Sequence, residues 1–221
     1  MGLKCFEIIL NLLFPPKCPF CKKVQDSVGI CAACEKELPW IPEHEILVEG
    51  HGKLRCAAPL WYEKEVREAL LELKFGGRAA VADALGEEVA RCAAEHLGGE
   101  FDVVTWVPVS KRRLKERGYD QVELLSRSIC RQWKSKPVKL LHKTVDTPPQ
   151  SGITDAAERR GNVLGAYEAV QPEKIQNSRI LLVDDIITTG ATIEECVRVL
   201  KEAGAASVVC VAVARTRRKG Q

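Results

Sequence analysis

The sequence predicts an α/β fold in which a mainly parallel sheet is flanked by helices, with a small cysteine-rich module before it. Apolar β-branched runs alternate with helical patterns from about residue 56 onward, and the first 55 residues hold two Cys-x-x-Cys pairs. At 221 residues the chain can bury one main core and carry a small extra module. We therefore expect two units, residues 1–55 and residues 56–221, with the boundary in residues 43–53.

The composition is that of an average globular protein. Hydrophobic residues make up 46% of the chain and charged residues 29%, which disfavours both a disordered chain and a membrane protein. The apolar stretch of residues 3–14 is too short to cross a bilayer and runs into two prolines with no small-residue cleavage site. We expect a short helix packed on the following module, with contact at a membrane surface as the alternative. A cytoplasmic protein with no membrane span is therefore expected, in which paired cysteines bind metal rather than form disulfides.

The cysteine pairs Cys18 with Cys21 and Cys31 with Cys34 predict a metal site. Each pair fits a tight turn that presents two thiolates, and four thiolates complete the tetrahedral shell of Zn²⁺. A closed set of four ligands leaves no open position for catalysis, so we expect structural zinc. An iron–sulfur cluster and a redox-active Cys-x-x-Cys motif are the alternatives. The remaining cysteines lie in apolar or helical contexts and are expected to be core or unpaired thiols: Cys5, Cys56, Cys92, Cys130, Cys196 and Cys210.

The elements of the second unit are expected in a regular order. Apolar spacing together with Ala, Glu and Leu content predicts helices over residues 66–75 and 80–97, and the β-branched residues 102–109 predict a buried strand leading into a loop. There follow a helix over residues 119–133, short strands over 138–141 and 165–170, a buried strand over 180–183, a helix over 193–203 and a last strand over 207–214. Because strand and helix alternate, the sheet should be mainly parallel and covered on both faces.

A loop of small residues follows the strand of residues 180–183. Two carboxylates come first and a helix begins near Ile193; the residues between are Asp184, Asp185, Thr188, Thr189, Gly190, Ala191 and Thr192. The unpaired N–H groups of a helix N-terminus bind phosphate, and carboxylates accept hydrogen bonds from ribose hydroxyls, directly or through Mg²⁺. The loop thus predicts a site that holds a sugar and its phosphate side by side. The alternative is a generic acidic pair at a strand end and a Thr192 that only caps the helix.

The thirteen residues ILLVDDIITTGAT, residues 180–192, resemble the signature of the type I phosphoribosyltransferases, which belong to the glycosyltransferase class and use phosphoribosyl pyrophosphate (PRPP). The resemblance implies the type I phosphoribosyltransferase fold. It also implies that Asp184 and Asp185 contact the ribose hydroxyls at the catalytic centre and that residues 188–192 wrap the 5-phosphate. The GxxxxGK[ST] pattern of a Walker A loop is absent from the sequence.

A basic segment follows the strand of residues 102–109. The pyrophosphate of PRPP needs cations or backbone donors at the end of a second strand, and Ser110, Lys111, Arg112 and Arg113 occupy that place in the alternation. We expect Lys111 and Arg112 to bind the pyrophosphate. An ordinary basic surface loop is the alternative.

Residues 144–162 form a long polar stretch rich in Pro, Gly and Arg. In a phosphoribosyltransferase this position implies a flexible loop that closes over PRPP and keeps water from the reacting ribose centre, with Gln150, Arg159 and Asn162 as its site residues. Arg159 and Arg160 either neutralise the leaving pyrophosphate or form a solvated pair.

The wider sequence resembles the ComF/GntX family. The matching parts are VPVSKRRLKERGYDQ (residues 107–121), the segment Leu73–Phe75, the cysteine module, and Gln150, Arg159 and Asn162 of the polar stretch. The resemblance thus spans nearly the whole chain. Tyr119 and Asp120 stand where the family more often has Phe and Asn. The resemblance implies a PRPP-binding protein that acts in the uptake or processing of single-stranded DNA during natural transformation. Its implied partners are single-stranded DNA and a DNA-uptake helicase or other competence proteins.

Two functions of other classes stay open: transfer of phosphoribose from PRPP to a small nucleobase or amine, and PRPP sensing without turnover. Thr188 occupies the place where purine salvage enzymes commonly carry a carboxylate, which weakens the case for a 6-oxopurine acceptor. The basic residues near the site suit the phosphates of single-stranded DNA. Its bases would stack on exposed aromatic side chains, for which the candidates are Trp61, Trp106, Trp133 and Tyr119.

Overall fold

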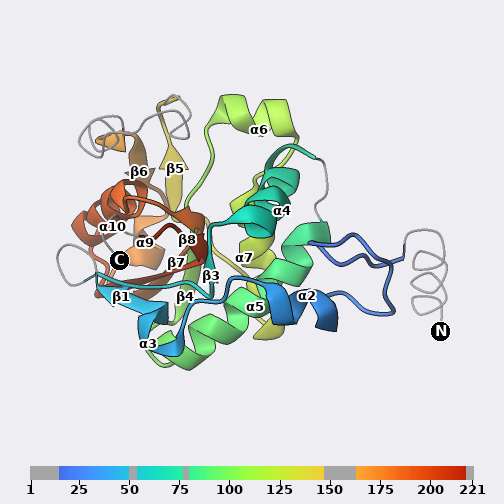
Figure 1. The fold of residues 1–221 in the computed structure, drawn as a ribbon. Helices are drawn as coiled ribbons and strands as arrows, with labels where there is room; N and C mark the ends of the chain where they lie inside the picture. Colours follow the sequence, from blue (N-terminus) through green and yellow to red (C-terminus); the bar gives the residue numbers. More distant parts are fainter. Residues whose placement is uncertain (1–14, 50–53, 77–79, 147–162, 218–221) are drawn as a thin grey trace, which may run out of the picture.

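The computed structural model describes residues 15–49, 54–76, 80–146 and 163–217 (Figure 1). Within these ranges a six-stranded sheet has the order β1-β2-β8-β7-β4, and β3 also pairs with β8. The strands are β1 (Leu47–Glu49), β2 (Arg55–Ala57), β3 (Leu60–Trp61), β4 (Val103–Trp106), β7 (Arg179–Ile187) and β8 (Ser207–Arg215). Every pairing is parallel except that of β1 with β2, which confirms the predicted mainly parallel sheet.

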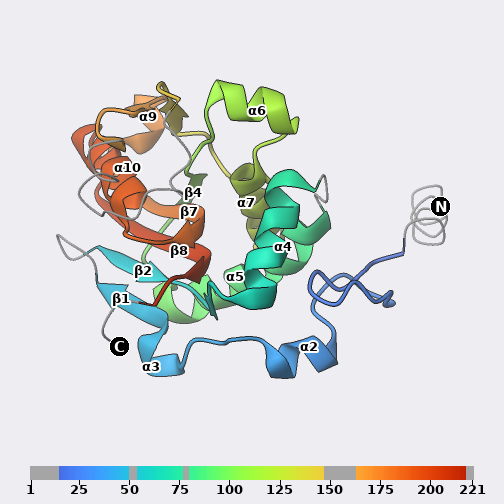
Figure 2. The same cartoon turned by 45° about the horizontal axis from the view of Figure 1, so that its top comes forward.

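Helices cover both faces of this sheet (Figure 2). Side chains alternate between the faces of a strand, so Leu181 and Val183 of β7 join one core cluster while Ile180 and Leu182 join another. The first cluster is completed by α4 (Lys64–Phe75), α5 (Ala80–Leu97) and α7 (Gln121–Gln132), and the second by α9 (Pro172–Ile175) and α10 (Ala191–Glu202). Burial on both sides explains why residues 180–183 of β7 and residues 208–214 of β8 are all apolar.

The predicted helices and central strands are confirmed with small shifts at their ends. The helix of residues 119–133 begins at Gln121 because Asp120 caps it, accepting hydrogen bonds from the N–H groups of Val122 and Glu123. The expected strand of residues 138–141 was wrong in position, since the strand is β5 (Leu141–Lys143). Residues before it follow the edge of β4 instead, where the Val138 N–H donates to the Val104 carbonyl at 2.8 Å.

The basic segment after β4 is a helix, α6 (Lys111–Arg117), where the sequence predicted a loop. Ser110 caps its first turn by accepting a hydrogen bond from the Arg113 N–H at 3.4 Å. Gly118 ends it in the left-handed conformation, with φ of 78°, and donates its N–H to the Leu114 carbonyl. The two caps hold a seven-residue helix that has no buried residue of its own.

A small antiparallel pair, β5 with β6 (Tyr167–Ala169), lies beside α10. The Thr144 N–H donates to the Ala166 carbonyl at 2.9 Å, and the Gly165 N–H donates to Glu195 Oε1 of α10 at 2.7 Å. The first bond extends the pairing of β5 with β6, and the second links the pair to α10.

The N-terminal module contains α2 (Ala32–Glu37) and α3 (Glu43–Ile46) and packs against α4 and α5. Leu38 is buried in the same cluster as those two helices, with Phe20, Ile30 and Trp40 partly buried against it. The module is therefore fixed to the main core by apolar contacts as well as by the chain.

Several sequence expectations lie outside the described residues: the helix of residues 3–14, and Gln150, Arg159, Arg160 and Asn162 of the polar stretch. Within the described ranges, no helix combines the length and the apolar character that crossing a membrane requires.

Candidate functional site

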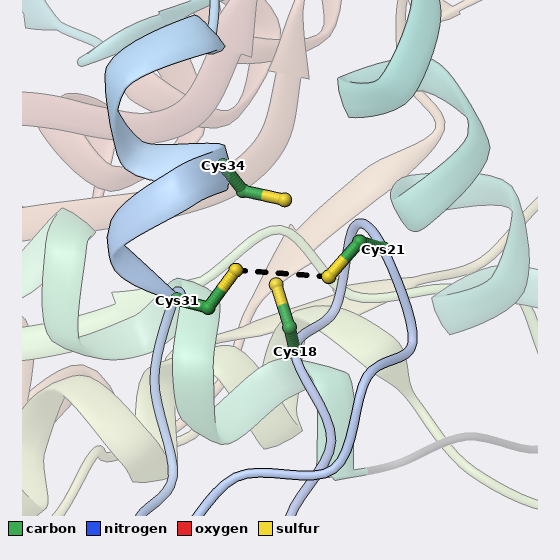
Figure 3. Close-up of side chains that lie close together, drawn as sticks. All are labelled: Cys18, Cys21, Cys31 and Cys34. Atoms are coloured by element: carbon green, nitrogen blue, oxygen red, sulfur yellow. Dashed lines mark hydrogen bonds between the residues drawn. The ribbon is translucent and has the colours of Figure 1, made fainter.

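Four cysteine side chains converge in the N-terminal module (Figure 3). Cys31 and Cys34 lie at the start of α2, and Cys18 and Cys21 lie on a turn closed by the Lys22 N–H donating to the Cys18 carbonyl at 3.0 Å. All four sulfur atoms lie within 4.8 Å of one another, and the Sγ atoms of Cys21 and Cys31 are 3.6 Å apart. Tetrahedral Zn²⁺ with Zn–S bonds of about 2.3 Å requires sulfur atoms about 3.8 Å apart. The arrangement therefore fits a structural zinc ion, as the sequence predicted.

The thiol of Cys18 is prepared for metal binding by its surroundings. Burial acts to raise its pKa, but backbone hydrogen bonds from Cys31, Cys21 and Phe20 outweigh that effect and lower the pKa to about 7. Because the thiolate is the form that binds a metal, these donors favour that form at Cys18, whereas burial and the neighbouring cysteines raise the pKa of Cys34.

The acidic residues Asp184 and Asp185 lie inside β7, three and two residues before its end, rather than after a strand that stops at Val183. The strand is longer than predicted because β8 pairs with it as far as Ile187. Both carboxylates are buried, with 8% and 7% of their surface exposed. The pair thus lies at the carboxyl end of the parallel sheet, where open α/β sheets bind their ligands.

Asp185 has three partners from distant parts of the chain, two of them direct. Its Oδ2 lies 2.9 Å from the Nζ of Lys74 and accepts a hydrogen bond of 3.0 Å from the Nε2 of Gln121. Arg117 in turn donates to the Oε1 of Gln121 at 2.5 Å. The end of α4, the end of α6 and the start of α7 therefore meet at this carboxylate.

Asp184 has a different environment. Burial, and then the charge of Asp185, raise its pKa to about 8, although the Asp185 N–H donates to its Oδ1 at 2.8 Å. Lys143 of β5 is also buried nearby, and burial followed by the positive charge of Arg113 lowers its pKa. A carboxyl group and an ammonium group are thus both held away from water beside the end of β7. Buried groups with shifted pKa values are typical of sites that bind a polar ligand.

The phosphate loop of the sequence prediction forms the start of α10. Gly190 precedes the helix in the left-handed conformation, with φ of 84°, and its carbonyl accepts the Glu194 N–H at 2.8 Å. Thr189 Oγ1 accepts a hydrogen bond from the Ala191 N–H at 3.4 Å, and Thr188 is exposed while Thr192 is half-buried. The N–H groups of a twelve-residue helix therefore open beside the acidic pair.

The basic residues expected to bind pyrophosphate lie on α6. Lys111 and Arg112 are exposed, and Arg112 is near two acids, 3.3 Å from Glu116 and 3.4 Å from Asp146. Arg113 lies closer to the site, because its positive charge acts to lower the pKa of Lys143 and of Tyr167. Among the described residues, α6 reaches the acidic pair through Arg117 and Gln121 rather than through Lys111 or Arg112, so the roles of Lys111 and Arg112 stay a prediction.

Asp120 joins the loop after β4 to α7. Its Oδ2 accepts hydrogen bonds from Trp106 Nε1 at 3.2 Å and from the Val109 N–H at 3.1 Å, while its Oδ1 accepts from the first turn of α7. A carboxylate suits four donors, whereas an amide would turn one of its own donors toward them. Tyr119 donates its hydroxyl to the Leu73 carbonyl at 2.6 Å. Tyr119 and Asp120, the two departures from the family pattern, therefore both have hydrogen-bond partners.

The sequence reasoning missed Lys74, Gln121 and Lys143 as members of the site. Lys74 and Gln121 lie in the segments that carried the family resemblance, but nothing in their spacing shows that they meet at Asp185. The proposed aromatic stacking groups are not exposed: Trp61 and Trp106 are buried, and Tyr119 and Trp133 are half-buried.

Two family models match the chain. A double zinc ribbon domain matches residues 9–46, and a phosphoribosyl transferase domain matches residues 128–221. The fold and the two matches define a protein with the type I phosphoribosyltransferase fold and an N-terminal zinc module, as predicted. The zinc ribbon match and the four-sulfur cluster together support structural zinc.

Curated relatives cover most of the chain. The DNA utilization protein YhgH of Escherichia coli (strain K12) is 31% identical over 214 residues, covering 85% of this chain and 91% of the relative. Competence protein F of Haemophilus influenzae is 27% identical (90% and 90%), and competence protein ComFC of Bacillus subtilis is 24% identical (87% and 74%). The chain therefore belongs to the ComF-type family of proteins with a phosphoribosyltransferase fold.

Solved structures are more distant. A glutamine PRPP amidotransferase from B. subtilis, complexed with ADP and GMP, is 22% identical with a TM-score of 0.40. The match covers 64% of this chain but 30% of that structure, so the chain spans less than a third of its length.

Proposed function

We propose that this protein binds PRPP at the carboxyl end of β7 and acts on single-stranded DNA in its uptake or processing, as a cytoplasmic protein with a zinc module (residues 1–55) and a phosphoribosyltransferase domain (residues 56–221). The observation that carries the proposal is the buried acidic pair of β7, which leads through a left-handed Gly190 into the N-terminus of α10. The printed names of the relatives, competence proteins and a DNA utilization protein, support the role with DNA.

PRPP would be bound in two halves. Asp184 and Asp185 accept hydrogen bonds from the ribose hydroxyls, and residues 188–192 donate backbone and hydroxyl hydrogens to the 5-phosphate. Lys111 and Arg112 neutralise the pyrophosphate. Gln150, Arg159 and Asn162 would close over the bound molecule, which would exclude water from the ribose centre.

Magnesium fits the same place. Burial and the neighbouring Asp185 raise the pKa of Asp184, so a cation bound at the pair would favour its ionised form, and carboxylate oxygens are preferred ligands of Mg²⁺. Asp184 and Asp185 would hold the ion together with oxygens of PRPP, and the ion would neutralise charge on the substrate. Lys74 already supplies one positive charge to Asp185.

The test is titration of PRPP with Mg²⁺ by calorimetry. Above the pKa of Asp184, which is about 8, changing Asp184→Asn and Asp185→Asn together keeps size but removes the charge. Losing one or two charge-assisted hydrogen bonds of about 1.5–3 kcal/mol each then weakens binding about tenfold or more. Thr192→Val should weaken it less, because the backbone N–H groups remain. Asp26→Asn, an exposed acid of the zinc module, is the matched control. Unchanged affinity in the folded double variant contradicts the proposal.

Turnover is tested separately by measuring pyrophosphate release from PRPP with DNA, nucleobases and amines as acceptors. Release that depends on a nucleobase or amine identifies a small-molecule phosphoribosyltransferase. Binding without release under any acceptor identifies a PRPP sensor.

A further inference from the structure

Phe75, the last residue of α4, is 70% exposed. The guanidinium carbon of Arg117 lies 4.8 Å from the centre of its ring. One face of the ring is therefore covered by a cation, and the exposure means that the rest is open to solvent. An exposed hydrophobic residue alone needs no explanation, but a ring that carries a guanidinium over one face and is 70% exposed presents its other face to solvent.

The ring is linked to the candidate PRPP site through short contacts. Lys74, its neighbour in sequence, lies against Asp185, and Arg117 reaches the same carboxylate through Gln121. The Tyr119 hydroxyl also fixes the end of α4 by its bond to Leu73. The aromatic surface thus lies at the rim of the site and is held there from two sides.

The helix beside the ring is strongly basic. Glu116 is the one acidic residue of α6, whereas Lys111, Arg112 and Lys115 are exposed cations and Leu114 is 45% exposed. Lys111 and Lys115 are four residues apart and so lie on one side of the helix. In both views of the fold, α6 lies next to α4 at the edge of the molecule (Figures 1 and 2). Its charge is complementary to a chain of phosphates.

We propose that Phe75, Arg117 and the exposed lysines of α6 form a docking surface for single-stranded DNA, in which a base stacks on the open face of Phe75 and phosphates contact Lys111 and Lys115. This inference rests on the proposed role with DNA and names the surface that performs it. A duplex does not fit, because its bases are already stacked and paired, whereas every unpaired base offers a ring face. The surface would bring a base to the rim of the PRPP site.

Fluorescence anisotropy with two labelled oligonucleotides of equal length tests the stacking step. One carries thymines and the other carries only abasic sugars. Phe75→Ala should weaken thymine oligonucleotide binding about 5- to 150-fold, the range for loss of one stacked base, and leave abasic oligonucleotide binding unchanged. Phe75→Trp should retain the affinity. Val24→Ala, which alters a 60% exposed apolar side chain of the zinc module, is the matched control.

The phosphate step is tested in the same assay. Lys111→Ala with Lys115→Ala should weaken both oligonucleotides and reduce the salt slope by about 1.4, since each phosphate contact on a single strand contributes about 0.7. Lys136→Ala with Lys174→Ala, at exposed lysines elsewhere, should leave the slope unchanged.

PRPP titration of Phe75→Ala separates this proposal from the proposed function. Unchanged PRPP affinity with selective loss of the thymine oligonucleotide supports the docking surface. If Phe75→Ala binds both oligonucleotides as the unaltered protein does, the docking surface is wrong and PRPP and DNA binding stand. If the unaltered protein binds no single-stranded DNA, the docking surface and the DNA role both fail, while PRPP binding is judged by its own titration.

Discussion

Asp184 and Asp185 are adjacent and equally buried, yet their surroundings differ. Asp185 lies against the ammonium group of Lys74 and accepts a hydrogen bond from the side-chain amide of Gln121. Asp184 faces burial and a neighbouring carboxylate, which raise its pKa to about 8. Two residues of the same type thus have different electrostatic surroundings, which are set by the elements packed around them.

PRPP binding is therefore expected to depend on pH through Asp184. The protonated carboxyl dominates below pH 8 and accepts hydroxyl hydrogen bonds poorly, so PRPP affinity should rise as pH increases from about 6.5 to 9. Calorimetric titration across this range measures the effect. The Asp184→Asn variant is the control, because its amide cannot ionise and any pH dependence of its PRPP affinity comes from the phosphates of PRPP. If PRPP affinity changes with pH equally in the variant and the unaltered protein, the role of Asp184 is contradicted.

At this scale the sequence predicted the acids but not their partners. The pair and the glycine are visible because they are contiguous in the chain. Lys74 and Gln121 meet Asp185 only through the packing of α4 and α7 on the sheet, at separations of 111 and 64 residues that no local pattern reveals.

Among the elements, α6 is a helix that the hydrophobic pattern of the sequence does not predict. A helix is recognised by an apolar stripe, and α6 buries no residue, so its sequence looks like a basic loop. Its signals were only the capping residues Ser110 and Gly118. The central helices were predicted because their buried faces impose the spacing.

The zinc module is expected to carry about one zinc ion per chain, measured by elemental analysis of protein prepared without chelators. Metal binding supplies roughly 10–16 kcal/mol to small zinc modules, so Cys21→Ser should lose the metal and unfold the cysteine-rich part of residues 1–55, while β1 and β2 stay paired in the main sheet. The remaining domain should survive, which PRPP titration and circular dichroism would measure.

Ser27→Ala, at an exposed position of the same module, serves as the control and should retain the metal. Iron, or no metal, in the unaltered protein would contradict the zinc assignment. A Cys21→Ser protein that also loses PRPP binding would show that the module's apolar contacts through Leu38 support the main core.

For the whole molecule, the distribution of charge matters more than the net charge of +3. Binding of single-stranded DNA should weaken steeply with salt, because phosphate contacts release counterions. Arg112→Ala with Arg113→Ala should lower the slope by about 1.4. Arg127→Ala with Arg131→Ala, two exposed arginines of α7, should change it less. Equal binding from about 50 to 300 mM salt, or none, would remove DNA from the partners.

The architecture of the whole sheet was predictable where strands are long and buried on both faces, as β7 and β8 are. The edge of the sheet was not predictable, because β1, β2 and β3 are only two or three residues long. β2 and β3 pair with β8, about 150 residues away in sequence, and β1 pairs with β2. Short strands carry too few side chains to show an alternation.

The pairing of β2 and β3 with β8 has a consequence for biosynthesis. The ribosome makes β2 and β3 about 150 residues before β8, their common neighbour, so these two strands stay unpaired with β8 while the intervening chain is made, and one side of β7 also stays unpaired until β8 follows. The four zinc ligands, by contrast, lie within residues 18–34 and are complete almost at once. Nascent chains should therefore acquire their metal long before the sheet closes, and a stalled chain lacking β8 would expose strand edges that invite aggregation.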